Sequence, residues 1–234
     1  MRYIYLVRHG QASLGALDYD RLSDIGLRQA SLLGAWLHAN GVPLARAICG
    51  QPRRHIETAK AILAGWPAGS SSVCQLTVDS AFDEFDPHAV LVAYDAIFAA
   101  QAPGSFGPIG DMTAEDFRAL FTRAFNRWVG GSYDSDYPVP WQEFKKRCLN
   151  AFEEITNRVG EGAEALVVSS AGPIAAICQH YLQTSNDRVD ELRGQLFNTS
   201  VTRFAGQPGA LALMKFNEIP HLATAANPDL TTLL

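Results

Sequence analysis

The chain has 234 residues, 47% of them hydrophobic, with a formal net charge of −5 and a pI of about 5.6. This length and apolar content suit one domain with a full core better than two small domains. The negative charge excludes an overall positive field, so we expect no nucleic-acid or membrane partner, and any anion site must be local. Apolar runs fall far short of the roughly 20 residues of a membrane span, and the N-terminus shows no export signal, so a cytoplasmic protein is expected.

In the first part of the chain, predicted strands alternate with predicted helices. Aromatic and β-branched residues over 2–7 indicate a buried strand. Ser23 is placed to cap the amphipathic helix that follows, and Gly41 ends that helix. A second strand over 45–49 precedes a helix that includes residues 57–63. This order predicts β-α-β units and therefore a mostly parallel sheet.

Between residues 87 and 140 the pattern changes to helical stretches, near 89–100 and 114–128, separated by segments rich in Gly, Pro, Tyr and Asp. We interpret 87–140 as a helical insertion or cap, whose aromatic residues mainly pack its interior. The core resumes with a helix over 144–159, a strand over 165–169, a helix beginning at Gly172-Pro173, and two strands over 201–204 and 211–216. The prediction is a single α/β domain over 1–234, a three-layer α/β/α sandwich with a mostly parallel central sheet.

The cysteines are widely spaced and form no CxxC pair, which favours neither a zinc site nor a redox motif. They are Cys49, Cys74, Cys148 and Cys178. We expect buried free thiols, as is usual in a reducing cytoplasm.

The tripeptide Arg8-His9-Gly10 follows the first predicted strand. Open parallel sheets bind ligands at the carboxyl ends of their strands, so this turn is well placed for a site. Arginine offers a two-pronged donor to phosphate oxygens, glycine allows close approach of the backbone, and the imidazole of His9 can attack phosphorus.

A second candidate segment lies where the strand over 45–49 gives way to its helix. Arg54 stands near that helix N-terminus, where free backbone N–H groups attract anions and where a cation is unfavourable for the helix dipole. This placement favours an anion partner for Arg54. Arg53 and His55 are expected to face solvent or the rim of the pocket.

Several spaced segments, in one order along the chain, resemble branch 1 of the histidine phosphatase superfamily, the phosphoglycerate mutase-like enzymes. The segments are Leu6 to Gln11, Leu22 to Ala30, Arg54 with Thr58 and Ala59, Phe82 to Phe85, Ser169 to Ile174, Asn198, and Asn217 with His221 and Leu222. The resemblance covers the core from end to end and is weak only across the insertion.

The resemblance implies a nucleophile and an anion clamp. His9 would take up the phosphoryl group as a phosphohistidine, which splits one difficult transfer into two easier ones. Arg8 and Arg54 would hold the phosphoryl oxygens and stabilise the charge of the transferring group. Gly10 and Ser13 would add phosphate contacts.

The resemblance also implies a general acid, Glu84, with a pKa raised by its pocket so that it can protonate the leaving oxygen. Asp83 and Asp86 are adjacent alternatives for this role. The scheme requires no metal and no cofactor.

The sequence departs from the family pattern at two positions. The family's late strand ends in Ser-His-Gly-Gly-Pro, and here Ser170 stands where the second histidine is expected. A neutral hydroxyl contributes about 1 kcal/mol against about 1.5 to 3 for a charged hydrogen bond, so transition-state binding could fall roughly tenfold. The family also often has an asparagine six residues after the nucleophile, where this chain has Gly15. Ser170, Ser13, a water or His55 could fill the lost contact.

We interpret the chain as a metal-independent phosphomonoester hydrolase acting through a phosphohistidine on His9. The substrate would be a small phosphorylated molecule or a phosphoprotein, selected by the insertion over 87–140. One alternative is a catalytically impaired relative that binds phosphate or a phosphorylated partner. A mutase is a further alternative, less favoured because a mutase must hold its intermediate away from water. The sequence leaves the oligomeric state open.

Overall fold

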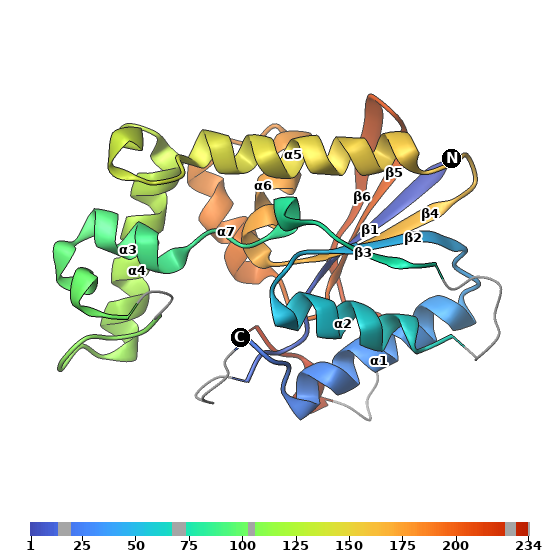
Figure 1. Cartoon of the computed structure of the whole chain (residues 1–234), viewed down its shortest axis with the longest axis horizontal. Coiled ribbons are helices and arrows are strands. Elements are labelled where there is room, and N and C mark those ends of the chain that lie inside the picture. The colour runs from blue at the N-terminus through green and yellow to red at the C-terminus, as the bar shows by residue number, and fades with distance from the viewer. Residues whose placement is uncertain (14–19, 67–73, 103–105, 223–227, 234) are drawn as a thin grey trace.

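The computed structural model describes residues 1–13, 20–66, 74–102, 106–222 and 228–233. Within this part of the chain, six strands form one sheet in the order β3-β2-β4-β1-β5-β6 (Figure 1). The strands are β1 (Arg2–Arg8), β2 (Leu44–Cys49), β3 (Leu76–Val78), β4 (Glu164–Ser169), β5 (Val201–Gln207) and β6 (Ala210–Glu218). Strands β1 to β4 are parallel, whereas β5 and β6 form an antiparallel hairpin beside β1. The predicted mostly parallel sheet is confirmed. The short β3 was not predicted from the sequence.

Helices cover both faces of the sheet, as Figure 1 shows. They are α1 (Asp24–Ala39) and α2 (Arg53–Leu63) on one face, with α5 (Trp141–Arg158) and α6 (Ala171–Leu182) on the other, and α7 (Val189–Gln195) beside α6. Because side chains alternate along a strand, β1 sends Ile4 and Leu6 into one cluster and Tyr5 and Val7 into the other. The predicted three-layer α/β/α architecture is confirmed.

Helix α1 begins and ends at the residues that the sequence predicts. Ser23 Oγ accepts the N–H of Gly26 at 3.1 Å, which is an N-cap bond. Gly41 follows the helix with φ of +66°, a left-handed conformation that glycine adopts without strain. Helix α5 begins at Trp141 rather than at the predicted residue 144, directly after Pro140.

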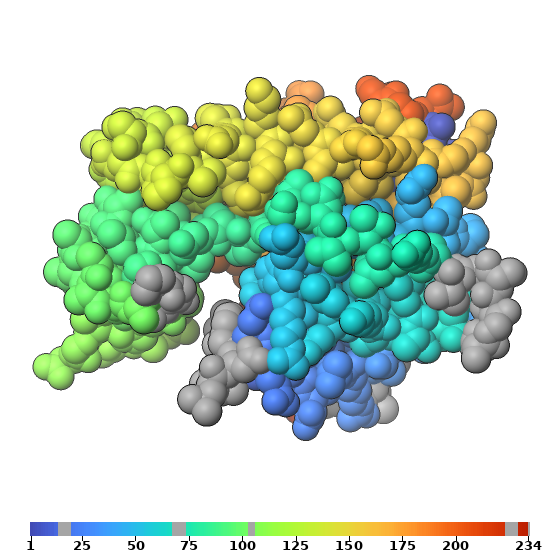
Figure 2. Space-filling view, viewed as in Figure 1, coloured from blue at the N-terminus to red at the C-terminus, as the bar shows by residue number. Residues whose placement is uncertain are grey.

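The insertion contains α3 (Pro87–Tyr94), a 3-10 segment (Ala96–Ala100) and α4 (Ala114–Gly130). The predicted helical stretch near 89–100 is divided in two, because Asp95 is extended and its side chain caps the 3-10 segment by accepting from Ile97 N–H. Figure 2 shows the insertion (green) as a lobe at one end of the molecule, away from α1 (blue). Most of its aromatic side chains are buried as expected, whereas Phe106 and Tyr133 are about half exposed.

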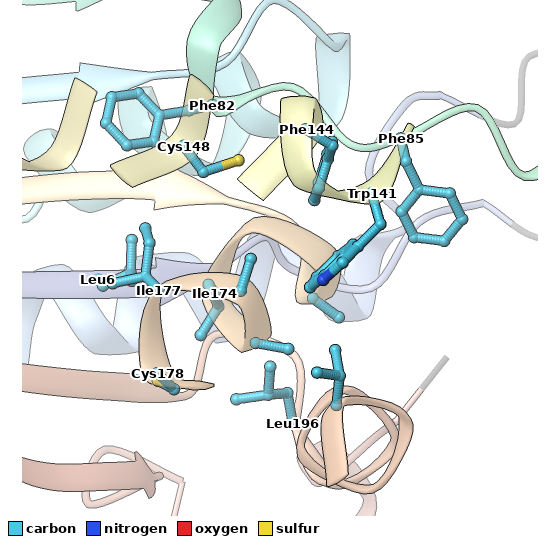
Figure 3. Packing of buried hydrophobic residues seen from close by; sticks show 14 of the residues in the cluster. Leu6, Phe82, Phe85, Trp141, Phe144, Cys148, Ile174, Ile177, Cys178 and Leu196 are labelled. Carbon is cyan, nitrogen blue, oxygen red and sulfur yellow. The ribbon is translucent and has the colours of Figure 1, made fainter. Parts of the chain in front are cut away.

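The apolar cluster of the insertion is continuous with that of the sheet. In Figure 3, Phe85 lies beside Phe144 and Trp141 at the start of α5, and the Phe85 and Phe144 ring centres are 6.0 Å apart. The segment that carries Glu84 is therefore fixed against the core by its neighbour Phe85.

All four cysteines are free. Three are buried, but Cys74 is half-buried, so the expectation of burial is wrong for Cys74, which precedes β3 at the sheet edge. Within the described ranges, none of the helices has the length and apolar character to cross a membrane.

Candidate active site

The ends of β1 and β4 and the starts of α2 and α6 bring together His9, Arg54 and Ser170, and Glu84 reaches the start of α6 from the segment after Phe82. His9 is only 7% exposed, and its Nδ1 lies 2.8 Å from the carbonyl oxygen of Gly10. A carbonyl oxygen can only accept, so Nδ1 carries the proton and Nε2 keeps a lone pair. His9 thus presents one basic nitrogen for attack.

The electrostatics of the site keep His9 neutral. Burial lowers the pKa of His9 well below its ordinary value, and the positive charges of Arg54 and Arg8 lower it further. A neutral imidazole is the form that a nucleophilic role would require, and His9 holds it at and below neutral pH.

Asn198 holds the backbone of the His9 turn. Its Nδ2 donates to the backbone carbonyl of His9 at 3.1 Å, and its Oδ1 accepts the hydroxyl of Thr232 at 2.8 Å. These bonds link the His9 turn to the start of β5 and to the C-terminal segment.

Arg54 lies in the first turn of α2, as predicted, with its side chain only 14% exposed. It donates to the carboxylate of Asp20 and, from Nη2, to Ser170 Oγ at 3.5 Å. Asp20 was not predicted as a partner of Arg54, since nothing in the local sequence pattern indicates that role. Arg53 faces solvent as expected and pairs with Glu57 at 2.6 Å.

The Arg8 guanidinium donates to the backbone carbonyls of Leu196 and, at 2.6 Å, Leu233. Its charge still acts on His9, whose pKa it lowers. In this structure Arg8 therefore ties α7 and the C-terminal segment to the site, and its phosphate contact stays a prediction.

Gly10 contributes close packing. Its N–H donates to Thr58 Oγ1 at 3.0 Å, so that group is already used within the protein. A Cβ at Gly10 would lie 2.6 Å from the carbonyl oxygen of Gly26, so only glycine lets the turn approach α1. Ser13 is half-buried and its N–H donates to the carbonyl of Arg21 at 2.9 Å, while Gly15 lies outside the described residues.

Glu84 reaches the N-terminus of α6. Its Oε2 accepts the N–H of Gly172 at 3.2 Å, and its Oε1 accepts the N–H of Phe85 at 3.2 Å. Burial nevertheless raises the pKa of Glu84, which favours a carboxyl group that holds a proton.

The two alternative carboxylates have structural partners. Asp83 Oδ1 accepts the N–H of Gln51 at 2.6 Å. Asp86 caps α3, with its Oδ1 accepting the N–H groups of His88 and Ala89. Glu84 also accepts backbone N–H groups, and burial raises the pKa of Asp83 as well as that of Glu84, so the general-acid role of Glu84 stays a prediction.

His55 is fully buried, with 0% exposure, so the expectation that it faces solvent or the rim is wrong. Helix α2 begins at Arg53, and its buried face carries His55, Thr58, Ala59 and Ile62. That 0, 3, 4, 7 spacing is the signal in the sequence that could have placed His55 inward. Its Nε2 lies 2.6 Å from Ser170 Oγ, which is only 1% exposed.

His221 forms a hydrogen bond with Thr199, which follows Asn198. The hydroxyl of Thr199 donates to Asn198 O at 2.7 Å, so Nε2 of His221 must donate to Thr199 Oγ1, 2.9 Å away. Burial lowers the pKa of His221 from its usual 6.5 to about 4. The folded protein therefore keeps this imidazole neutral.

Acid should consequently destabilise the fold. Below its ordinary pKa the unfolded state protonates His221 while the folded state does not, so stability is lost as pH falls from 6.5 toward 4. At pH 5 we expect a loss of about 2 kcal/mol from this group relative to pH 7. Urea unfolding at both pH values should show this excess loss in the wild type and not in His221→Gln. Equal losses in the two proteins would contradict the assignment.

In the part of the chain described, no group of three or more His, Cys, Asp or Glu side chains is arranged to hold a metal ion. The fold and the site together define an α/β protein with a buried neutral histidine and a nearby arginine at the strand ends. The sequence model of the histidine phosphatase superfamily (branch 1) matches residues 4–90 and 104–219, and the chain belongs to this family.

Solved structures agree with this fold. A mutant phosphoserine phosphatase of Entamoeba histolytica in complex with phosphoserine is 18% identical over 95% of this chain and 100% of its own, with a TM-score of 0.64. YhfR of Bacillus stearothermophilus is 19% identical over 94% and 99%, with a TM-score of 0.65. A mycobacterial glucosyl-3-phosphoglycerate phosphatase is 18% identical over 93% and 99%, with a TM-score of 0.61. A search of curated proteins gave no match. At these identities the likeness establishes the fold and leaves the substrate undetermined.

Proposed function

We propose that this protein is a phosphomonoester hydrolase that uses His9 as nucleophile and forms a phosphohistidine. The observation that carries the proposal is the state of His9: burial and two arginine charges lower its pKa, and the bond from Nδ1 to Gly10 leaves Nε2 with its lone pair. Such an imidazole can attack phosphorus without first losing a proton.

The reaction has two steps. His9 Nε2 attacks the phosphorus atom, the ester P–O bond breaks, and Glu84 gives its proton to the leaving alkoxide oxygen. Water then attacks the phosphohistidine, Glu84 takes a proton from that water, the N–P bond breaks, and inorganic phosphate leaves. Arg54 stabilises the charge on the transferring group in both steps, which the scheme achieves without a metal.

The substrate is proposed to be a phosphorylated small molecule or a phosphoprotein whose leaving group is selected by the insertion. Trp128 and Tyr137 line a cavity of about 330 Å³ together with Glu84. Phosphoserine and glucosyl-3-phosphoglycerate, which appear in the names of similar structures, are the first candidates for a substrate screen.

The test is steady-state hydrolysis of p-nitrophenyl phosphate from about pH 5 to 8, with and without EDTA, by the wild type and by His9→Ala. We expect that the wild type turns over the substrate equally with and without EDTA, and that His9→Ala does not. Phosphate binding without turnover, also on the candidate substrates, would instead favour the catalytically impaired relative. Formation of 2-phosphoglycerate from 3-phosphoglycerate in the presence of 2,3-bisphosphoglycerate would favour a mutase.

Gly172 offers a test of how Glu84 is placed. A Cβ on Gly172 would lie 2.0 Å from Glu84 Oε1, so Gly172→Ala must displace the carboxyl group. A displacement of about 1 Å can lower a rate about 10²-fold, and we expect this loss in kcat for β-glycerophosphate, whose alkoxide needs protonation. Gly194→Ala on α7 is the matched control, since nothing lies within 4 Å of its added Cβ. Equal activity of the two variants would argue against Glu84 as the acid.

A further inference from the structure

Two unusual residues of this site touch each other. Ser170, at the junction of β4 and α6, stands where the family pattern places a histidine, and a buried imidazole reaches the same point from α2. His55 Nε2 and Ser170 Oγ are 2.6 Å apart although 115 residues separate them in the chain. An imidazole is therefore present beside this position, supplied by a different element.

His55 and Ser170 also contact His9 and Arg54. The rings of His9 and His55 are stacked, with centroids 5.5 Å apart and planes 24° from parallel. Ser170 Oγ also lies 3.5 Å from Nη2 of Arg54. One hydroxyl thus joins the second imidazole to the anion-binding guanidinium.

The backbone leaves room for this imidazole. A Cβ on Gly50, at the end of β2, would lie 2.4 Å from His55 Nδ1, so a larger residue there would push the ring away. His55 Nδ1 is buried and has no hydrogen-bond partner. The bond from Nε2 to Ser170 is therefore the polar contact that orients the ring.

We propose that His55 is a positioning residue that supplies the second imidazole of the phosphoryl site and acts through the hydroxyl of Ser170. When Nε2–H donates to Ser170 Oγ, the serine O–H is left to donate to a phosphoryl oxygen. No covalent bond changes in this relay. The inference rests on the proposed function, since it assigns a role toward the phosphoryl group that His9 would receive.

Moving the imidazole tests the proposal. We compare the wild type with His55→Ala, Ser170→His and the double variant His55→Ala/Ser170→His, and measure kcat for p-nitrophenyl phosphate and the Kd of inorganic phosphate by calorimetry. His55→Ala should weaken phosphate binding and lower kcat by up to about tenfold, the size expected from losing one buried neutral hydrogen bond that orients the Ser170 hydroxyl. Ser170→His alone should also lose activity, because two imidazoles would crowd a fully buried space.

The double variant is the decisive one. It returns an imidazole to the β4–α6 junction while vacating the space of His55, and we expect both quantities to recover to within about threefold of the wild type. A merely structural His55 predicts that the double variant is no better than His55→Ala, and that result would overturn the proposal. An unchanged phosphate Kd in His55→Ala would overturn it as well.

Controls separate folding from binding. His38→Ala removes an exposed imidazole of α1 and should leave kcat and the phosphate Kd unchanged. If His55→Ala fails to fold, as judged by circular dichroism, His55→Gln takes its place. Gln keeps an N–H donor and should retain most of the phosphate affinity, and a complete loss of affinity in folded His55→Gln would count against the relay.

Failure of this inference and failure of the proposed function give different results. Activity that requires His9 but is indifferent to His55 would remove the relay and leave the hydrolase. A protein without His9-dependent turnover, whose phosphate affinity nevertheless falls in His55→Ala and recovers in the double variant, would keep the relay and remove the hydrolase.

Discussion

Replacing His9 with alanine should lower kcat for p-nitrophenyl phosphate by at least about 10³-fold, because the nucleophile of a covalent mechanism has no substitute in the site. The charges of Arg54 and Arg8, which now lower the pKa of His9, would remain beside the vacated space. Inorganic phosphate should therefore still bind to His9→Ala, within about tenfold of its wild-type Kd. The variant thus separates binding from chemistry.

The intermediate provides an independent measurement for the same prediction. A rapid quench of the wild type with labelled substrate should show one phosphoryl group that is stable in alkali and labile in acid, as expected of a phosphorus–nitrogen bond. The label should be absent from His9→Ala. A label that persists in that variant, or turnover within tenfold of the wild type, would place the nucleophile elsewhere.

Replacing Glu84 with glutamine should lower kcat/KM for β-glycerophosphate by about 10³-fold, since general acid catalysis typically contributes 10² to 10⁴. The same change should lower kcat/KM for p-nitrophenyl phosphate at most about tenfold, because kcat/KM reports the first step, in which p-nitrophenolate leaves without a proton. Asp86→Asn is the matched control, since asparagine caps a helix as well as aspartate does. Equal losses for both substrates in Glu84→Gln would contradict the general-acid role.

The pH profile should carry the same signature. Burial raises the pKa of Glu84, and the acid form is the active one in the first step, so kcat/KM for the alkyl ester should fall as pH rises through that pKa. Burial lowers the pKa of His9, which moves the loss from protonating the nucleophile to lower pH. We expect an alkaline decline for the alkyl ester, and a Glu84→Gln profile without that decline.

The sequence was sufficient to predict the layers and that His9 and Arg54 lie near each other. Alternating apolar residues in β1, the cap at Ser23 and the repeated strand-helix order are local patterns, and they predict parallel strands whose carboxyl ends meet at one edge. His9 and Arg54 follow strands in that pattern, so their convergence could be predicted. Glu84 was predicted only from the resemblance, and Asp83 and Asp86 were equally close in sequence.

The tertiary structure decided which partners these residues have. Arg8 binds the carbonyls of Leu196 and Leu233, and the Gly10 N–H binds Thr58, because segments distant in the chain supply those acceptors. The inward position of His55 depends on where α2 begins and how it is rotated against β4. Its contact with Ser170 joins residues 115 positions apart. Local patterns determine which elements form, whereas the pairing of polar groups across the site depends on how those elements pack together.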